Sequence, residues 1–324
     1  MNQKAEIAVK GKGYTVRTAK SESRLTKAFR TQRSLLFLSM PFVIYIFVFY
    51  YLPTVGWLMA FQNFKPHLGL FKSAWAGVLH FGVLFSEATF YQVLRNTLAM
   101  SLINMSFSFL SSILLAIILN EVRNAYFKRT IQTVSYLPYF VSWAVAANIV
   151  MVTLSSDGGA VNAVLTAVGI LKDPVLWLGE EKLFWLVIAA TNVWKNVGWN
   201  AIIYLAAMTS IPQELYEAAS IDGAGRIKRI FSITLPGISP IIKILLIMSC
   251  GNILNTGFEQ QMLLGNPLVA NVYEVLDLFV IRFGIAMGRY SFATAAGMFK
   301  TIVSITLLVT ANWVIKKMGE DRLF

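Results

Sequence analysis

Long charge-free stretches alternate with short charged segments along this sequence. Three stretches carry no charge at all, and three others carry a single lysine each. A helix of about 20 mostly apolar residues crosses roughly 30 Å of hydrocarbon. The pattern therefore predicts an all-α polytopic membrane protein with six transmembrane helices. The predicted spans are Ser34–Phe64, Asn96–Asn120, Thr130–Ser156, Leu183–Met208, Pro236–Phe258 and Tyr290–Ile315.

A seventh apolar segment, Val275–Met287, is short and contains Asp277 and Arg282. We expect it to be a surface or re-entrant piece rather than a span. The first span follows a tail of more than thirty residues and is too long for a cleavable signal peptide, so we expect it to remain in the mature protein.

Charge placement gives the spans a direction. The chain has 324 residues, of which 56% are hydrophobic and only 14% charged, which argues against a water-soluble globule. Its 28 basic and 16 acidic residues give a net charge of +12. With six spans, 19 of the 28 cations fall on the side of the N-terminal tail. The positive-inside rule then predicts a bacterial inner-membrane protein with both termini on the cytoplasmic side. We expect the surplus positive charge to face anionic lipid head groups, so the net charge of +12 no longer indicates a nucleic-acid partner.

Metal chemistry has little support in the sequence. The chain has one cysteine, Cys250, and two histidines, His67 and His80, too few and too far apart for the usual zinc sites. We expect no metal and no cofactor in this chain.

The longest cytoplasmic connection, Ser210–Pro240, reads SIPQELYEAASIDGAGRIKRIFSITLPGISP. Ser210 and Gln213 have the spacing of a capping box, and Pro212 favours a first helical turn, so a helix should begin here. Gly223 should end that helix, and a second basic helical piece should run to Pro236, where the fifth span begins. An amphipathic linker lying on the lipid would show the same features.

The same loop carries a family signature. Its residues fit the pattern EAA-x3-G-x9-I-x-L-P without a departure, and two spans follow it. The chain thereby resembles the permease subunits of binding-protein-dependent bacterial ABC importers, with the type I transmembrane fold and a cytoplasmic coupling helix. The residues to which the resemblance assigns coupling to the ATPase are Glu217, Ala218, Ala219, Asp222, Gly223, Leu235 and Pro236.

The resemblance also implies partners. They are a second homologous permease subunit, a dimer of ATP-binding subunits and a periplasmic solute-binding protein. No G-x4-G-K-[ST] phosphate loop occurs in the sequence, so the partner ATPase would bind ATP and magnesium, and this chain would be non-catalytic. The domain organisation that follows is a basic tail at 1–33, a first span with a periplasmic loop at 34–94, a transmembrane core at 95–315 with its coupling loop at 210–240, and a cytoplasmic tail at 316–324.

Three further stretches narrow the resemblance: TVSYLPYFVSWAVAANIV, NTGFEQQMLLGNP and GRYSFATAAGMFKTIVSITLLVTAN. They are similar to sugar permeases that handle oligosaccharides and polysaccharide fragments, including those of bacterial alginate importers. An oligosaccharide, and among these an acidic, alginate-like one, is the cargo that this implies.

Polar residues inside the spans suggest where the cargo passes, because they are costly in lipid and face a cavity or a neighbouring helix. In the fourth span four such residues fall at i, i+3, i+4 and i+7, and the fifth span has a thinner polar face. Amides and an indole suit sugar hydroxyls and pyranose faces, and a lysine suits a carboxylate. The candidate path residues are Asn192, Lys195, Asn196, Trp199, Ser249, Asn252 and Asn255.

A structural interpretation of these residues stays open. The asparagines can bond neighbouring helices, and Lys195 can extend toward an interface. Lys300, deep in the last span beside small residues, is expected to pair within the assembly. Two other functions also remain open: a stand-alone secondary transporter and a membrane-embedded glycan-processing enzyme. The first should show inverted repeats and acids within its spans, and the second a carboxylate cluster. The sequence shows neither.

Overall fold

The computed structural model describes residues 33–317, so the predicted tails at 1–33 and 316–324 lie almost entirely outside the described residues. The chain forms two compact units, one ending at Gly56 and the other beginning at Trp57. The helical segment Arg33–Phe61 runs from the first unit into the second. It consists of α2 (Arg33–Ile46), the π-helical turn η1 (Phe47–Tyr51) and the 3-10 helix η2 (Leu52–Phe61).

Along the described part of the first unit, large apolar side chains such as Phe37, Phe42 and Phe49 are exposed. This is the surface that a helix surrounded by lipid requires. The predicted first span is therefore confirmed as a segment long and apolar enough to cross a membrane.

The second unit begins with a small hairpin that the all-α prediction did not include. Strand β1 (Gln62–Asn63) pairs antiparallel with β2 (Ala74–Trp75), with Gln62 opposite Trp75. Two short helices, α3 (Gly69–Lys72) and α4 (Leu79–Ser86), accompany it. The chain is thus mostly helical.

The remainder of the second unit is built from long helices joined by shorter ones. Its first half contains α5 (Ala88–Glu121), α6 (Ala125–Tyr136), η3 (Leu137–Phe140), α7 (Trp143–Thr153), α8 (Ala160–Ala167) and α9 (Glu181–Thr209). Its second half contains α10 (Gln213–Ile221), α11 (Arg226–Arg229), η4 (Ile230–Thr234), α12 (Leu235–Gly251), α13 (Glu259–Leu264), η5 (Pro267–Val269), α14 (Ala270–Tyr273), α15 (Leu276–Ile281), η6 (Arg282–Ala286) and α16 (Tyr290–Lys317).

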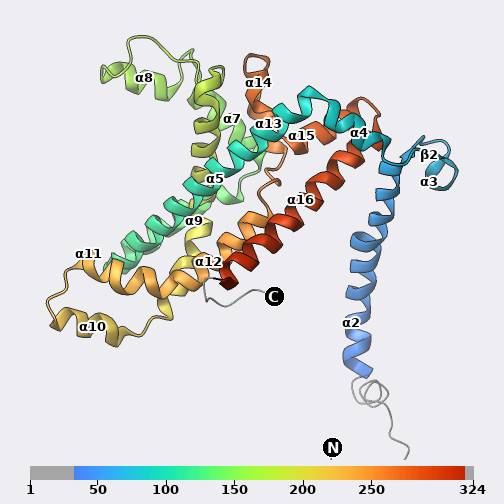
Figure 1. The fold of residues 1–324 in the computed structure, drawn as a ribbon. Coiled ribbons are helices and arrows are strands. Elements are labelled where there is room, and N and C mark those ends of the chain that lie inside the picture. Colours follow the sequence, from blue (N-terminus) through green and yellow to red (C-terminus); the bar gives the residue numbers. More distant parts are fainter. Residues whose placement is uncertain (1–32, 318–324) are drawn as a thin grey trace, which may run out of the picture. The chain divides into compact units, whose positions relative to one another are not determined.

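Helix α5 makes the most extensive packing contact of this unit. It packs along α9 over the most extensive helix–helix contact, and α12 packs on α16 (Figure 1). One core cluster joins α5 and α9 to α12 through Leu119, Tyr204 and Ile238. A second cluster surrounds Phe90 and Phe279 near the start of α5. Figure 1 shows α10 and α11 at one end of the unit and α8 and α14 at the opposite end.

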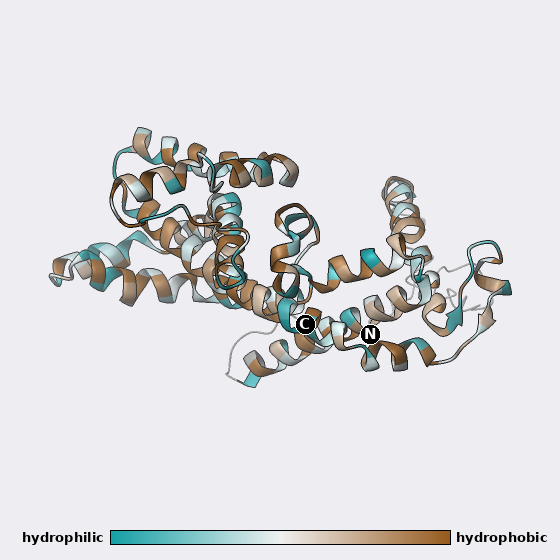
Figure 2. Cartoon of the chain, turned by 90° about the horizontal axis from the view of Figure 1, so that it is seen from above, coloured by the Kyte–Doolittle hydropathy of each residue, from teal (hydrophilic) through white to brown (hydrophobic). Residues whose placement is uncertain are grey.

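Within residues 33–317, four helical segments are long and apolar enough to cross a membrane (Figure 2). They are Arg33–Phe61, Ala88–Glu121, Arg226–Gly251 and Tyr290–Val314. The predicted third span is a bent pair, Ala125–Phe140 and Trp143–Thr153, which turns by 106° at the break between them. The predicted fourth span is α9, a 29-residue helix that is long enough but less apolar than these segments. The count of six spans thus stays a prediction.

The short segment at Val275–Met287 forms α15 and η6 and is partly buried. Leu276 and Phe279 are fully buried in the core cluster around Phe90, while Ile285 and Met287 at its end are exposed. Both charges of the segment are paired, Asp277 with Lys300 and Arg282 with Glu274, and the expectation of a surface or re-entrant piece stays a prediction.

Candidate functional site

The loop at 210–240 folds as a helix that stops at a glycine. Helix α10 begins at Gln213, with Pro212 in the extended N-cap position and no side-chain cap. The predicted capping box is wrong: the Ser210 hydroxyl donates to the Ala207 carbonyl and so belongs to the end of α9. The physical reason is Pro212, because a residue before proline is driven out of the helical region and Ile211 therefore separates the two helices.

The stop at Gly223 is confirmed. Gly223 has φ of +74°, a left-handed conformation that costs a residue with a Cβ roughly 1–2 kcal/mol. Its N–H donates to the Ser220 carbonyl, and the Ala224 N–H donates to the Ala219 carbonyl at 2.8 Å. This pair of bonds is a Schellman motif, which satisfies the last carbonyls of α10 and turns the chain toward α11.

The second half of the loop is continuous with a long helix. From Arg226 to Gly251 the chain is one 26-residue helical segment, so the expected start of the fifth span at Pro236 is too late. Pro236 is accommodated by the π turn η4, in which the Leu235 N–H donates to the Ile230 carbonyl. A proline inside a regular helix would clash with the carbonyl four residues before it, and the wider turn avoids this.

Two contacts hold α10 against this helix. The Tyr216 hydroxyl lies 3.0 Å from the Thr234 hydroxyl, which is almost fully buried. Ile211 packs on Gly237, where an added Cβ would come within 2.5 Å of the Ile211 side chain. The loop is thus fixed to the helix that continues from it.

The outer side of the loop presents apolar surface. Ile221 is 87% exposed, and Ile227 and Leu215 are also exposed. Glu217 and Ala218 are exposed beside them, while Ala219 is half-buried. A cluster of exposed large apolar side chains marks a surface that contacts a partner or lipid.

A polar cavity of about 300 Å³ lies between α5, α9 and α12. Residues of the non-helical segment 252–258, which follows α12, form part of its wall. None of the lining residues is charged. They are Ser101, Asn104, Met105, Ser108, Phe109, Ser112, Asn192, Asn200, Ile203, Tyr204, Leu245, Ser249, Asn252, Ile253, Asn255 and Thr256.

Several polar atoms of this cavity lack a hydrogen-bond partner among the described residues. They are the Asn104 Oδ1, Ser112 Oγ and Thr256 Oγ1 atoms. Ser112 is only 1% exposed. Buried hydroxyls and amides are nearly always hydrogen-bonded, so these three buried atoms would gain a partner if water or a polar ligand reached them.

The structure divides the predicted path residues into two groups. Asn192, Ser249, Asn252 and Asn255 line the cavity. The other three, Lys195, Asn196 and Trp199, do not. The Asn196 amide donates to the Asn192 carbonyl at 3.0 Å.

Sequence reasoning missed the contribution of α5. Its residues Ser101, Asn104, Ser108 and Ser112 line the cavity. They recur at intervals of three or four in a charge-free span, a polar stripe of helical period that the sequence does contain. In α9 the expected stripe was rotated, because the lining continues from Asn192 to Asn200 rather than to Trp199.

Lys195 and Trp199 hold the bend between α6 and α7. The Lys195 ammonium donates to three backbone carbonyls, those of Pro138 at 3.2 Å, Tyr139 at 2.9 Å and Val141 at 2.5 Å. The Trp199 ring stacks on the Tyr139 ring with centroids 4.5 Å apart. Only 6% of Lys195 is exposed. One face of α9 thus donates to carbonyls at the bend, of which the Pro138 carbonyl also accepts from the Val141 N–H at 3.2 Å.

Comparisons with known proteins agree with this architecture. Residues 108–319 match the family described as the binding-protein-dependent transport system inner membrane component. Protein LplB of Bacillus subtilis (strain 168) is 39% identical over 319 residues, 98% of this chain and 100% of LplB. The polygalacturonan/rhamnogalacturonan transport system permease protein YteP of the same organism is 40% identical over 293 residues, 90% of this chain and 91% of YteP.

Two solved structures have the same fold. One is a bacterial ABC transporter involved in the import of the acidic polysaccharide alginate, with a chain that is 36% identical at a TM-score of 0.84 and covers 92% of this chain and 100% of that chain. The other is a bacterial alginate ABC transporter in complex with an alginate pentasaccharide-bound periplasmic protein. It has a TM-score of 0.84 at 34% identity and covers 93% of this chain and 100% of that chain.

Replacing Lys195 tests its role at the bend. Lys195→Met removes the donor shared by three carbonyls and should lower the thermal unfolding temperature of the detergent-solubilised chain. Leaving buried carbonyls without a donor costs about 1–3 kcal/mol. Lys182→Met, which removes an exposed lysine at the start of the same helix, serves as the control and should leave the temperature unchanged. Equal temperatures for both variants would contradict the role.

Proposed function

The chain belongs to the inner membrane components of binding-protein-dependent transport systems, and from that premise we propose that it forms half of a translocation path for an oligosaccharide. It is a permease subunit of an ABC importer, non-catalytic and without a cofactor of its own, and ATP is hydrolysed by a partner chain. A second, homologous permease subunit supplies the other half of the path. A periplasmic binding protein delivers the cargo to the loops at 65–95, 157–182 and 259–289.

One observation carries the proposal: a single helical segment joins the exposed loop to the polar cavity. The segment begins at Arg226, directly after the Gly223 turn, and ends at Gly251. Leu245 and Ser249 near its end line the cavity, and Asn252 follows directly. A movement of α10 is passed to this segment through the Tyr216–Thr234 contact and reaches the cavity wall along one continuous helical segment.

The exposed loop is the surface on which an ATPase subunit docks. Glu217 offers a carboxylate to a basic group of that subunit, while Ala218 and Ala219 allow close approach. Asp222 and Gly223 end the helix, and Leu235 and Pro236 belong to the π turn and the start of α12. These seven residues thus shape one mechanical element, driven by a dimer of ATPase subunits.

The cavity suits a sugar because its lining offers amides and hydroxyls, which bond sugar hydroxyls as donors and acceptors. A second cavity of about 370 Å³ shares Asn252 and Asn255 with the first and extends the path along α16. The named functions of YteP and of the alginate transporter support an acidic oligosaccharide, such as an alginate or polygalacturonate fragment, as cargo. The amide N–H groups can bond its carboxylates.

In the membrane, the chain has six spans, with the bent pair α6–α7 as the third and α9 as the fourth. The basic tail and the loop at 210–240 face the cytoplasm, in agreement with the surplus of cations on that side. Membership in the importer family argues against both earlier alternatives, the stand-alone secondary transporter and the glycan-processing enzyme.

The Gly223 turn should be essential for coupling. Proline at this position cannot adopt a φ of +74° and removes the N–H that bonds Ser220. We expect Gly223→Pro to abolish the stimulation of ATP hydrolysis by cargo-loaded binding protein in proteoliposomes, and Glu217→Lys to weaken it strongly. Both variants should insert into the membrane at normal levels.

A neighbouring glycine provides the control. Gly225 has φ of −65°, and an added Cβ meets no atom within 4 Å. Gly225→Ala should therefore keep the stimulation. Normal stimulation in Gly223→Pro would refute the assignment of the coupling loop.

Ser112 gives a test of the cavity that separates transport from stability. Its hydroxyl is buried without a partner in the described chain, so Ser112→Ala should not lower the thermal unfolding temperature. If the hydroxyl bonds the cargo, oligosaccharide uptake should fall by about three- to tenfold, the equivalent of one hydrogen bond.

Ser111→Ala is the matched control, because the Ser111 hydroxyl bonds the Phe107 carbonyl of its own helix at 2.6 Å and does not line the cavity. Uptake should remain normal in this variant. Equal uptake by the Ser112 and Ser111 variants would count against the cavity as the cargo path.

A further inference from the structure

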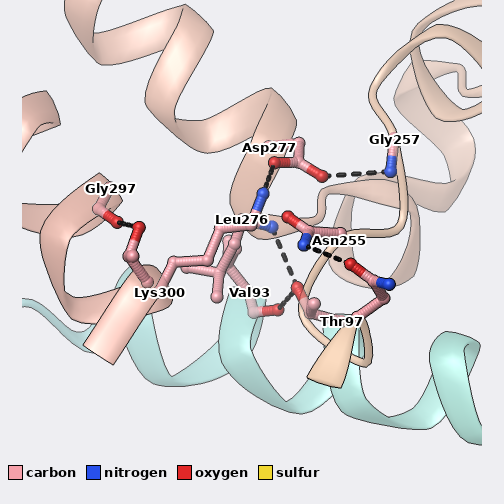
Figure 3. Close-up of polar contacts among 10 residues, drawn as sticks. Val93, Thr97, Asn255, Gly257, Leu276, Asp277, Gly297 and Lys300 are labelled. Atoms are coloured by element: carbon pink, nitrogen blue, oxygen red, sulfur yellow. Dashed lines mark hydrogen bonds and ion pairs between the residues drawn. The ribbon is translucent and has the colours of Figure 1, made fainter. Parts of the chain in front are cut away.

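Lys300 carries a charge inside the last helix, and its partner comes from α15. An ionisable side chain within a span needs a partner, because an isolated charge in hydrocarbon is costly. The Lys300 ammonium bonds the Asp277 Oδ1 atom (Figure 3). The expectation that Lys300 pairs within the assembly is thus met inside this chain.

The second oxygen of the same carboxylate is also engaged. Asp277 Oδ2 accepts a hydrogen bond from the Gly257 N–H at 3.0 Å. Asp277 therefore links α16 to a segment that lies twenty residues before it in the sequence (Figure 3). Hydrogen bonds to a charged acceptor are about twice as strong as neutral ones.

Gly257 belongs to the non-helical segment 252–258, between α12 and α13. Asn252, Asn255 and Thr256 of this segment line the polar cavity, and the Asn255 amide donates to Asn252 Oδ1 at 3.1 Å. Gly257 itself has φ of +71°, so the chain reverses direction there. The hydrogen bond from Gly257 to Asp277 thus holds segment 252–258 to α15 at a position two residues from Asn255.

The helix that carries Asp277 is fixed by its neighbours. The neighbouring Leu276 is fully buried, and its N–H donates to the hydroxyl of the buried Thr97 at 2.9 Å. The Thr97 hydroxyl in turn donates to the Val93 carbonyl at 2.8 Å (Figure 3). Helix α15 is therefore fixed on α5, and Asp277 is held where it can fix the segment.

We propose that Asp277 is a positioning residue that holds segment 252–258 in the shape that lines the cavity, with Lys300 as its anchor. The proposal rests on the function proposed above, in which the cavity binds the cargo. Asp277 acts through Gly257 and does not touch the sugar. Lys300 neutralises the Asp277 carboxylate and so offsets part of the free-energy cost of removing this charge from water.

The test measures the segment directly, in the assembled full-length importer in native membranes. The single native cysteine is removed by Cys250→Ala, and Thr256→Cys introduces a thiol at a position whose hydroxyl is buried without a partner in the described chain. A small methanethiosulfonate reagent reports how often the segment opens. In an Asp277→Ala background we expect the labelling rate to rise by roughly tenfold or more, as loss of a charge-assisted bond implies.

Transport gives a second readout. Without the tie, the half-saturating concentration of cargo-loaded binding protein should rise while the maximal stimulation of ATP hydrolysis persists, because the coupling loop is intact. Asp277→Asn keeps one acceptor for Gly257 and should give a smaller rise in labelling. If Asp277→Ala does not assemble, Asp277→Asn replaces it in the test. A labelling rate in Asp277→Asn equal to that of the protein with Asp277 would then overturn the proposal.

The second ion pair of this region provides a matched control. Arg282 and Glu274 form an ion pair with Nε and Oε1 2.9 Å apart, and burial raises the pKa of Glu274 while Arg282 opposes the rise. Neither side chain bonds segment 252–258 in any contact described here. Arg282→Gln should leave the labelling rate unchanged.

The outcomes separate the two proposals. An unchanged labelling rate in assembled Asp277→Ala, or an equal rise in Arg282→Gln, would overturn the positioning role. Faster labelling restricted to the Asp277 variants, combined with normal uptake, would support the positioning role and count against the cavity as the cargo path.

Discussion

The structure depends on one constraint: within hydrocarbon, every backbone polar group needs a partner inside the protein. A regular helix meets this constraint by itself, and a broken one does not. The breaks therefore show where the chain uses its costly side chains. At the bend between α6 and α7, Lys195 serves three carbonyls. After α12, Asp277 serves the Gly257 N–H. At η4 no side chain is needed, since the π turn itself closes around Pro236.

These breaks divide the second unit into elements that differ in stiffness. The segment Arg226–Gly251 stays helical from the loop to the cavity and can transmit movement along its length. A glycine of positive φ lies near each end, Gly223 three residues before the segment and Gly257 six residues after it. A helical segment that runs from a docking surface to a binding site is a suitable element for passing a displacement between them.

The sequence predicted the parts of this arrangement that depend on composition or on local backbone chemistry. It located the four segments that are long and apolar enough to cross a membrane because charge is nearly excluded from them, and it located the Gly223 turn because glycine alone adopts that conformation at little cost. It failed where tertiary contacts decide. Nothing local distinguishes the face of α9 that carries Lys195 from the face that carries Asn200, and the role of Asp277 depends on Gly257 and Lys300, which are distant in the chain. The polar stripe of α5 had the right period and was overlooked because serine is common in membrane helices.

The positions of charges and amides suggest how such a path handles an acidic cargo. Lys195 was the candidate for a carboxylate of the cargo and Lys300 was expected to pair within the assembly, and both are engaged by groups of this chain. The lining of the first cavity combines amides and hydroxyls with apolar side chains and carries no charge, whereas Lys300 lines the second cavity. The lysines within the spans thus hold bends and segments of the chain in place. Under the proposed function, the amides and hydroxyls of the first cavity are the groups that remain to bond a polar cargo.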